Sequence, residues 1–245
     1  MRPARAAAAA LLVLAGCGGD DGEPRLVVSA ASSMTQALTD CGPDFDGPTL
    51  RYSFAGSDEL AAQIRQGVKP DVYAAANTAI PEELHADGLL SAPVEFATNE
   101  LVIAVADLSS ISGLADLTRP GTKVAIGSES VPIGSYTREL LSRLPGDAGE
   151  SILANVRSNE PDVRGIVGKL VQGAADAGFV YATDVEAAAG KLRAVGLPPA
   201  IEPDVTYAAG VVEGAKQPEL AREFVDGLRE GGCADALAAA GFGKP

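Results

Sequence analysis

The sequence predicts an α/β protein, in which β-strands and α-helices alternate along the chain. Short apolar runs bounded by turn residues recur between segments with helical periodicity. Hydrophobic residues make up 47% of the chain and glycine contributes 28 residues, which is typical of a folded Ala-, Gly- and Val-rich α/β protein and not of a disordered one. The length of 245 residues is enough for a large core or for two lobes.

The N-terminus has the features of a targeting segment. Two arginines precede an apolar run at 6–15 that is too short to span a bilayer. The run ends in Leu-Ala-Gly-Cys, which resembles a bacterial lipoprotein signal. We therefore expect residues 1–16 to be a signal peptide, Cys17 to carry lipid, and residues 17–24 to form a flexible tether. The alternative is an ordinary secretory signal with an incidental cysteine.

Strand and helix signals alternate through the rest of the chain. Apolar runs predict strands at 25–30, 50–55, 71–76, 101–106, 123–127, 176–181 and 205–212. Apolar residues spaced three and four apart predict helices that begin near 33, 57 and 134, one over 163–171, and two closing segments, the first over 220–228. This alternation argues for parallel βαβ construction.

Four segments share one design: an apolar strand, then a small or hydroxyl residue, then the start of a helix. They are VVSAASSMTQAL at 27–38, SFAGSDELAAQI at 53–64, VAIGSESVPIGSYTREL at 124–140 and NEPDVRGIVGKLV at 159–171. A helix N-terminus carries free backbone N–H groups and a partial positive charge. Several such ends that converge in one cleft would bind an anion without any lysine or arginine.

The charge balance limits the classes of partner. The chain has 33 acidic and 19 basic residues and a net charge of −14. This balance argues against nucleic acid and against anionic membrane surfaces as partners. A small anion remains compatible with it, because a local field can oppose the global one.

Two cysteines remain besides the predicted lipidation site, Cys41 and Cys233. Export would place them in an oxidising compartment, so the pair suggests a disulfide that joins the C-terminal segment to the N-terminal part of the fold. The alternative is two unpaired thiols. The sequence contains no spacing typical of metal ligands and a single histidine.

Six landmarks then occur in order: AASSMTQAL, FAGSDELAAQI, KPDVYAAAN, VPIGSY, PDVRG and AGFVYATD. Together they make residues 25–245 similar to the periplasmic molybdate-binding proteins of bacterial ABC importers, which are type II solute-binding proteins. The resemblance implies two α/β lobes, each a central sheet flanked by helices, joined by two short crossings. The chain has no long low-complexity linker after residue 24, so we expect short crossings around 96–101 and 205–209. They give one lobe at 25–97 plus 208–245 and the other at 98–207.

The resemblance also implies five ligand-binding positions, Ser33, Ser57, Ile133, Val163 and Tyr181. The serines would donate from hydroxyl and amide, Ile133 and Val163 from the backbone N–H, and Tyr181 from its phenol. The two serines would lie on the first lobe and the other three on the second, so one anion would bridge the lobes. The plainer alternatives are helix N-caps for the serines and a core position for Tyr181.

Two charged residues stand beside these positions. The family more often has a run of serines where this chain has Gly56 and Asp58. We interpret Asp58 as a first-turn acidic residue; if it faced the ligand, it would repel a dianion or accept a proton from a protonated anion. Arg164 is interpreted as a structural residue tied to a nearby carboxylate rather than as a ligand contact.

The resemblance thus implies an exported lipoprotein at the outer face of the cytoplasmic membrane. It would capture molybdate, and tungstate too, and deliver it to an ABC permease as a monomer with no cofactor or bound metal ion. The alternatives are a receptor for sulfate or phosphate, a structural or adhesive lipoprotein, and a secreted serine hydrolase. A hydrolase needs a base beside Ser33 or Ser57. The single histidine, His85 in PEELHADG, instead has the pattern of an exposed helical residue, and the sequence has no GxSxG motif.

Overall fold

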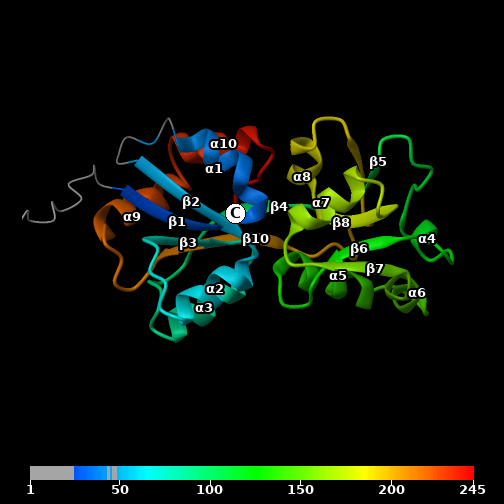
Figure 1. Cartoon of the computed structure of the whole chain (residues 1–245), viewed down its shortest axis with the longest axis horizontal. Coiled ribbons are helices and arrows are strands. Elements are labelled where there is room, and N and C mark those ends of the chain that lie inside the picture. The colour runs from blue at the N-terminus through cyan, green and yellow to red at the C-terminus, as the bar shows by residue number, and fades with distance from the viewer. Residues whose placement is uncertain (1–24, 43–44, 46–48) are drawn as a thin grey trace, which may run out of the picture.

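The computed structural model describes residues 25–42, 45 and 49–245. They form two lobes that lie side by side (Figure 1), each with a five-stranded sheet flanked by helices. The predicted α/β class and the two-lobed arrangement are confirmed. The predicted signal peptide, Cys17 and the tether lie outside the described residues. None of the described helices is long and apolar enough to cross a membrane.

The first lobe is built on a sheet with the strand order β2-β1-β3-β10-β4. Its strands are β1 (Arg25–Ala31), β2 (Thr49–Ala55), β3 (Val72–Ala75), β4 (Val94–Asn99) and β10 (Val205–Val211). Its helices are η1 (Ser32–Met34), α1 (Thr35–Cys41), α2 (Ser57–Arg65), α3 (Ala79–Ala86), α9 (Pro218–Gly227) and α10 (Gly232–Ala239). Figure 1 shows α1 and α10 on one face of this sheet and α2 and α3 on the other.

Strand β3 shows why an apolar run predicted a strand here. Its side chains alternate between the two faces: Val72 and Ala74 belong to the larger apolar core, whereas Tyr73 and Ala75 pack with α2 and α3. A strand that is covered by helices on both faces has no polar side, so its sequence is continuously apolar.

The second lobe has the strand order β7-β6-β8-β5-β9. Its strands are β5 (Leu101–Ala106), β6 (Val124–Gly127), β7 (Val156–Glu160), β8 (Ala177–Tyr181) and β9 (Leu192–Val195). Its helices are α4 (Leu114–Leu117), α5 (Pro132–Ser142), α6 (Ala148–Ala154), α7 (Val163–Val171) and α8 (Ala182–Ala187). In Figure 1, α7 and α8 cover one face and α5 and α6 the other.

The expectation of parallel construction is right for only part of each sheet. β1 is parallel to β2 and β3, and β6 is parallel to β7 and β8. β10 is antiparallel to both of its neighbours, as is β5. The reason is connectivity: β10 and β5 each enter their sheet from the other lobe and therefore run away from the cleft, whereas the strands beside them run toward it.

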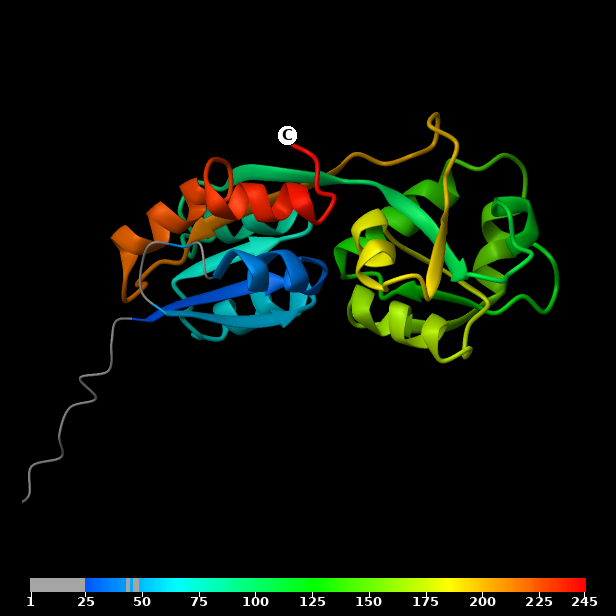
Figure 2. The same cartoon turned by 90° about the horizontal axis from the view of Figure 1, so that it is seen from above.

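Two segments connect the lobes (Figure 2). One is the junction at Glu100 between β4 and β5, and the other is the stretch 196–204 between β9 and β10. Val205, the first residue of β10, pairs with Asn99, the last residue of β4, so the first sheet extends to the point where both segments leave the lobe. The first sheet therefore includes residues 98–99 and 205–207, which the sequence assigned to the second lobe. Hydrogen-bond register sets the boundary between the lobes, and a sequence pattern does not record it.

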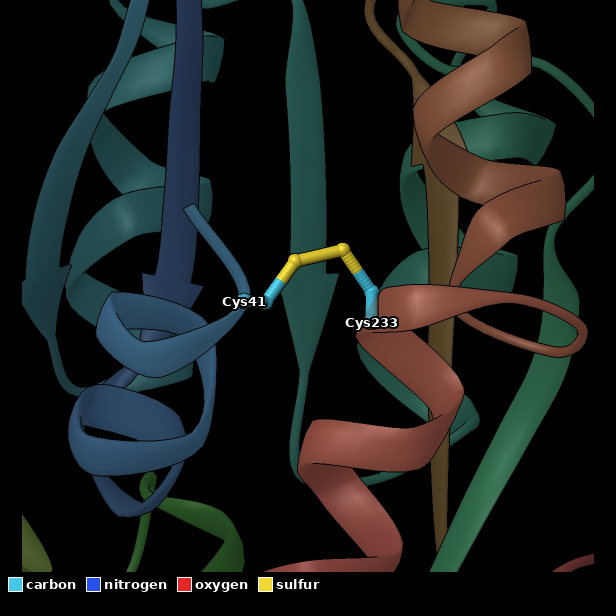
Figure 3. Close-up of a disulfide and its surroundings, with 2 residues drawn as sticks. All are labelled: Cys41 and Cys233. Atoms are coloured by element: carbon cyan, nitrogen blue, oxygen red, sulfur yellow. A yellow bond between two sulfur atoms is a disulfide. The ribbon is translucent and has the colours of Figure 1, made fainter. Parts of the chain in front are cut away.

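The structure joins Cys41 and Cys233 in a disulfide (Figure 3). Cys41 is the last residue of α1 and Cys233 lies in the first turn of α10, and their Cα atoms are 4.7 Å apart across a sequence separation of 192. Both side chains are buried. The bond holds the C-terminal helix against α1, the helix that directly follows η1 and therefore Ser33.

Candidate ligand-binding site

A small cavity lies between the two lobes, where strands end and helices begin. The space open to the centre of a water-sized sphere is ≈ 20 Å³, which is room for about one small group. Its lining residues are Ala31, Ser32, Ser33, Ala55, Gly56, Ser57 and Ala76 from the first lobe and Val131, Pro132, Ile133, Asp162, Val163 and Tyr181 from the second. The structure therefore brings all five sequence-predicted positions to one wall.

Ser57 lines this cavity, and its hydroxyl oxygen is already an acceptor. The residue is buried, and its Oγ accepts a hydrogen bond from the Ala76 backbone N–H at 3.2 Å. Since an N–H can only donate, the proton of the Ser57 hydroxyl is not used in that bond. Tyr73 fixes the backbone by donating to the Ser57 carbonyl at 2.7 Å. The N-cap of α2 is Gly56, so Ser57 does not fill the plain N-cap role.

Ser33 is partly exposed and occupies the middle of η1. The helix predicted to begin near this residue starts instead as a 3₁₀ turn, and α1 follows from Thr35. The N-cap residue of α1 is Met34, and no side chain forms a capping hydrogen bond there. The Ser33 Oγ lies 3.0 Å from the Tyr207 hydroxyl oxygen, so Ser33 is hydrogen-bonded to the crossing strand β10.

The second lobe contributes the first turns of two helices. Pro132 begins α5, two residues before the predicted start near Gly134, and Val163 begins α7. The backbone N–H groups of Ile133 and Val163 belong to these first turns, where an amide has no acceptor within its own helix. Gly134 is required here by close packing, because a Cβ at this position would lie 1.8 Å from the Ser128 carbonyl oxygen.

Tyr181 ends β8 and is one of the residues that line the cavity. The side chain is 1% exposed, and its hydroxyl oxygen has no hydrogen-bond partner among the described residues. Burial holds the pKa of this phenol well above its usual range, so it remains a neutral O–H donor. A buried polar group without a partner costs about 1–3 kcal/mol, and an acceptor bound in the cavity would remove that cost.

The wall of the cavity carries one charged side chain within the described part of the chain, Asp162, and neither lysine nor arginine. Asp162 caps α7: one carboxylate oxygen accepts from the Gly165 N–H at 3.0 Å, and the other lies 3.5 Å from the Arg164 guanidinium. Sequence reasoning missed this residue. The available signal was its place directly before a helix, where aspartate is a preferred N-cap.

The neighbouring charged residues do not reach the cavity wall. Arg164 pairs with Asp162 and donates to the Phe54 carbonyl of the first lobe at 3.0 Å, so it connects the lobes beside the cavity. Asp58 places its Oδ1 beside Gly56, buried and without a hydrogen-bond partner in the described ranges. A Cβ at Gly56 would lie 2.5 Å from the Pro161 carbonyl oxygen, so this close approach of the lobes requires glycine.

A second carboxyl group, Asp184, lies behind Tyr181. Its Oδ2 accepts a hydrogen bond from the Tyr181 backbone N–H at 3.0 Å. Burial raises the pKa of Asp184 to about 7, the Tyr181 hydrogen bond lowers it, and the negative charge of Asp162 adds to the increase. The group therefore changes its charge near neutral pH.

A cluster of metal-ligating side chains, or a histidine beside a serine, would indicate a different kind of site. Within the ranges that the structure covers, no three His, Cys, Asp or Glu side chains are grouped so that they could hold a metal ion. His85 lies on α3 with its Nδ1 2.9 Å from the Leu90 carbonyl oxygen, away from the residues that line the cavity.

Two α/β lobes around a small shared cavity define a protein that encloses a compact solute. The chain matches the family model described as "Bacterial extracellular solute-binding protein" over residues 26–243, and it belongs to that family. The "Molybdate-binding protein ModA" of Mycobacterium tuberculosis (strain H37Rv) is 38% identical over 235 residues, which cover 93% of this chain and 88% of that protein.

Two further comparisons agree with this assignment. The "Putative ABC transporter substrate-binding lipoprotein YvgL" of Bacillus subtilis is 29% identical over 249 residues, with coverage of 91% of this chain and 90% of the relative. The solved periplasmic molybdate-binding protein of Azotobacter vinelandii has the same fold, with a TM-score of 0.78, 20% identity, and coverage of 90% of this chain and 99% of that one.

Proposed function

We propose that this protein captures molybdate, and tungstate as well, in the cavity between its lobes and delivers it to an ABC permease. The observation that carries the proposal is Tyr181, which lines the cavity and whose buried hydroxyl lacks a partner among the described residues. The molybdate-binding relative from Mycobacterium tuberculosis supports the choice of ligand.

The donors around the cavity are sufficient for tight binding without a cation. They are the hydroxyls of Ser33 and Ser57, the Tyr181 phenol, and the backbone amides of the two serines, Ile133 and Val163. Hydrogen bonds to a charged group contribute about 1.5–3 kcal/mol each, so the gross gain is on the order of 10–20 kcal/mol. Association and closure offset a large part. A net of about 8–12 kcal/mol corresponds to micromolar to nanomolar affinity.

These groups are hydrogen-bond donors, and this property distinguishes between anions with and without a proton. A wall of donors suits a fully deprotonated dianion such as molybdate, tungstate or sulfate, whereas hydrogen phosphate also needs an acceptor. Asp58 does not supply one, because it is not among the cavity-lining residues. The Asp162 carboxylate is on the wall, and this observation favours phosphate as the second candidate ligand.

Titration calorimetry of the purified chain from residue 18 onward tests the ligand. We expect molybdate and tungstate to bind with micromolar or tighter affinity, and sulfate and phosphate at least about tenfold more weakly, because the relative that is 38% identical is a molybdate-binding protein. A bound anion should also raise the melting temperature by mass action. Tighter binding of phosphate would replace the first candidate by the second. No heat and no thermal shift with any of the four anions would contradict the proposal.

The proposed role does not involve catalysis. A serine nucleophile needs a general base within hydrogen-bond reach. The sequence has one histidine, and His85 is bonded to a backbone carbonyl outside the cavity lining. The donor wall is complete within one chain, which supports action as a monomer.

We further propose that Cys17 anchors the mature protein to the outer face of the cytoplasmic membrane. The support is the Leu-Ala-Gly-Cys sequence after a short apolar run, together with the relative that is described as a lipoprotein. A Cys17→Ser variant is expected to leave the membrane fraction in a cell fractionation experiment. Retention of this variant with the membranes would contradict an acyl anchor.

A further inference from the structure

A series of hydrogen bonds leads from the cavity into the crossing strands. The Ser33 Oγ lies 3.0 Å from the Tyr207 hydroxyl oxygen. The Asn99 side-chain nitrogen donates to that same hydroxyl at 3.5 Å and to the Thr183 hydroxyl at 2.9 Å. Asn99 and Tyr207 stand on β4 and β10, which pair at the crossing between the lobes, and Thr183 lies on α8 in the second lobe.

The direction of these bonds follows from one backbone amide. The Asn99 Oδ1 accepts from the Glu100 N–H at 2.9 Å, and an N–H can only donate. The amide oxygen must therefore be on that side, so the nitrogen faces Thr183 and Tyr207 and donates to both. The Tyr207 oxygen accepts from Asn99, which leaves its own proton available for the Ser33 Oγ, 3.0 Å away.

We propose that Tyr207 is a positioning residue that makes Ser33 a dedicated donor to the bound anion. With the Ser33 oxygen accepting from Tyr207, the Ser33 hydroxyl proton points to the cavity. Tyr207 is 0% exposed and is not a cavity-lining residue, so it acts through Ser33. Burial holds its pKa well above the usual range, so the phenol keeps the proton that this role requires.

The same arrangement occurs at Ser57, where the Ala76 N–H donates to the serine oxygen. Both serines therefore offer protons to the cavity. At these two positions the cavity favours ligand oxygens that carry no proton. This inference rests on the proposed function and specifies its substrate class as a fully deprotonated oxyanion.

The Tyr207→Phe substitution removes the hydroxyl and keeps the ring. We expect the Kd for molybdate to rise about threefold to tenfold, because a neutral hydrogen bond that orients a donor has been lost. We also expect the ratio of the hydrogen phosphate Kd to the molybdate Kd to fall, because the Ser33 oxygen can then accept a hydrogen bond from the ligand. Tyr52→Phe is the matched control: this hydroxyl is also buried, on the first lobe, but away from the cavity lining, and its removal should leave the Kd unchanged.

A double-mutant cycle separates positioning from a purely structural role. In a Ser33→Ala background, Tyr207→Phe should change the molybdate Kd by less than about twofold, because its effect passes through the missing hydroxyl. An equal effect of Tyr207→Phe in both backgrounds, or no effect in the parent, would overturn the proposal. If Ser33→Ala alone leaves the Kd unchanged, the failure belongs to the proposed ligand site rather than to Tyr207.

A second variant tests the direction of the hydrogen bonds and does not depend on the stability of Tyr207→Phe. Asn99→Asp replaces a donor to Tyr207 by an acceptor, so the Tyr207 proton turns away from Ser33. We expect Asn99→Asp to lose more molybdate affinity than Tyr207→Phe. In the Ser33→Ala background, Asn99→Asp should lower the affinity only through repulsion between the new charge and the anion. An effect of the same size in both backgrounds would contradict the proposed direction.

Discussion

Replacement of both Ser33 and Ser57 by alanine is expected to weaken molybdate binding by well over tenfold while the fold survives. Each hydroxyl would donate to a charged oxygen inside a small cavity, where a hydrogen bond contributes about 1.5–3 kcal/mol. The two losses together correspond to about two to four orders of magnitude in Kd. Residual binding should remain, because the backbone amides and the Tyr181 phenol are unaltered.

The measurement is titration calorimetry with molybdate, accompanied by melting curves without ligand. Ser57→Ala leaves the Ala76 N–H without its acceptor, so some loss of stability is expected in addition to the loss of binding. Ser91→Ala is the matched control, since the Ser91 Oγ likewise accepts from a backbone N–H, that of Val211, at 3.0 Å, but outside the cavity lining. The control should lose stability and keep its affinity. A double variant with the affinity of the parent would remove both serines from the proposed site.

The family resemblance supplied the five predicted positions that line the cavity, and a local pattern in the sequence agrees with it at three of them. Ser57, Ile133 and Val163 each lie in the first turn of a helix that begins within six residues of the end of a strand, so the pattern is local. Tyr207 and Asn99 gave no such signal. Tyr207 reaches Ser33 over a sequence separation of 174, and its apolar surroundings in VTYAAGVV indicate only a buried strand.

The strands that escaped prediction share a physical feature. Three strands were not predicted, and each lies at the edge of a sheet: β4 in the first sheet, and β7 and β9 in the second. β7 has the mostly polar sequence VRSNE with partly or fully exposed side chains. An edge strand is covered on fewer sides, so it lacks the apolar run that marks a central strand. The antiparallel strands β10 and β5 were found as strands, but their direction depends on which lobe the chain comes from, and no local pattern records that.

Buried Asp184 is expected to make the protein less stable as the pH rises from about 4 to about 7. Burial raises its pKa in the folded state from the usual 3.8 to about 7. Between these values the folded protein holds a proton that the unfolded chain has released, so the free energy of unfolding falls with increasing pH. The contribution is fully present below the unfolded pKa and is lost as the pH rises through the folded pKa. Three pKa units correspond to about 4 kcal/mol.

Urea unfolding of Asp184→Asn between pH 5 and pH 8 isolates this contribution from the other carboxyl groups. Asparagine stays neutral and its oxygen can still accept from the Tyr181 N–H, so the slope of stability against pH should be flatter than in the parent. Asp176→Asn is the control, because Asp176 also accepts from a backbone N–H, that of Lys123, but is exposed. Its slope should match that of the parent. Equal slopes for Asp184→Asn and the parent would show that Asp184 is already ionised in the folded protein at pH 5, and its buried charge would then have to be balanced by a group other than the Tyr181 amide.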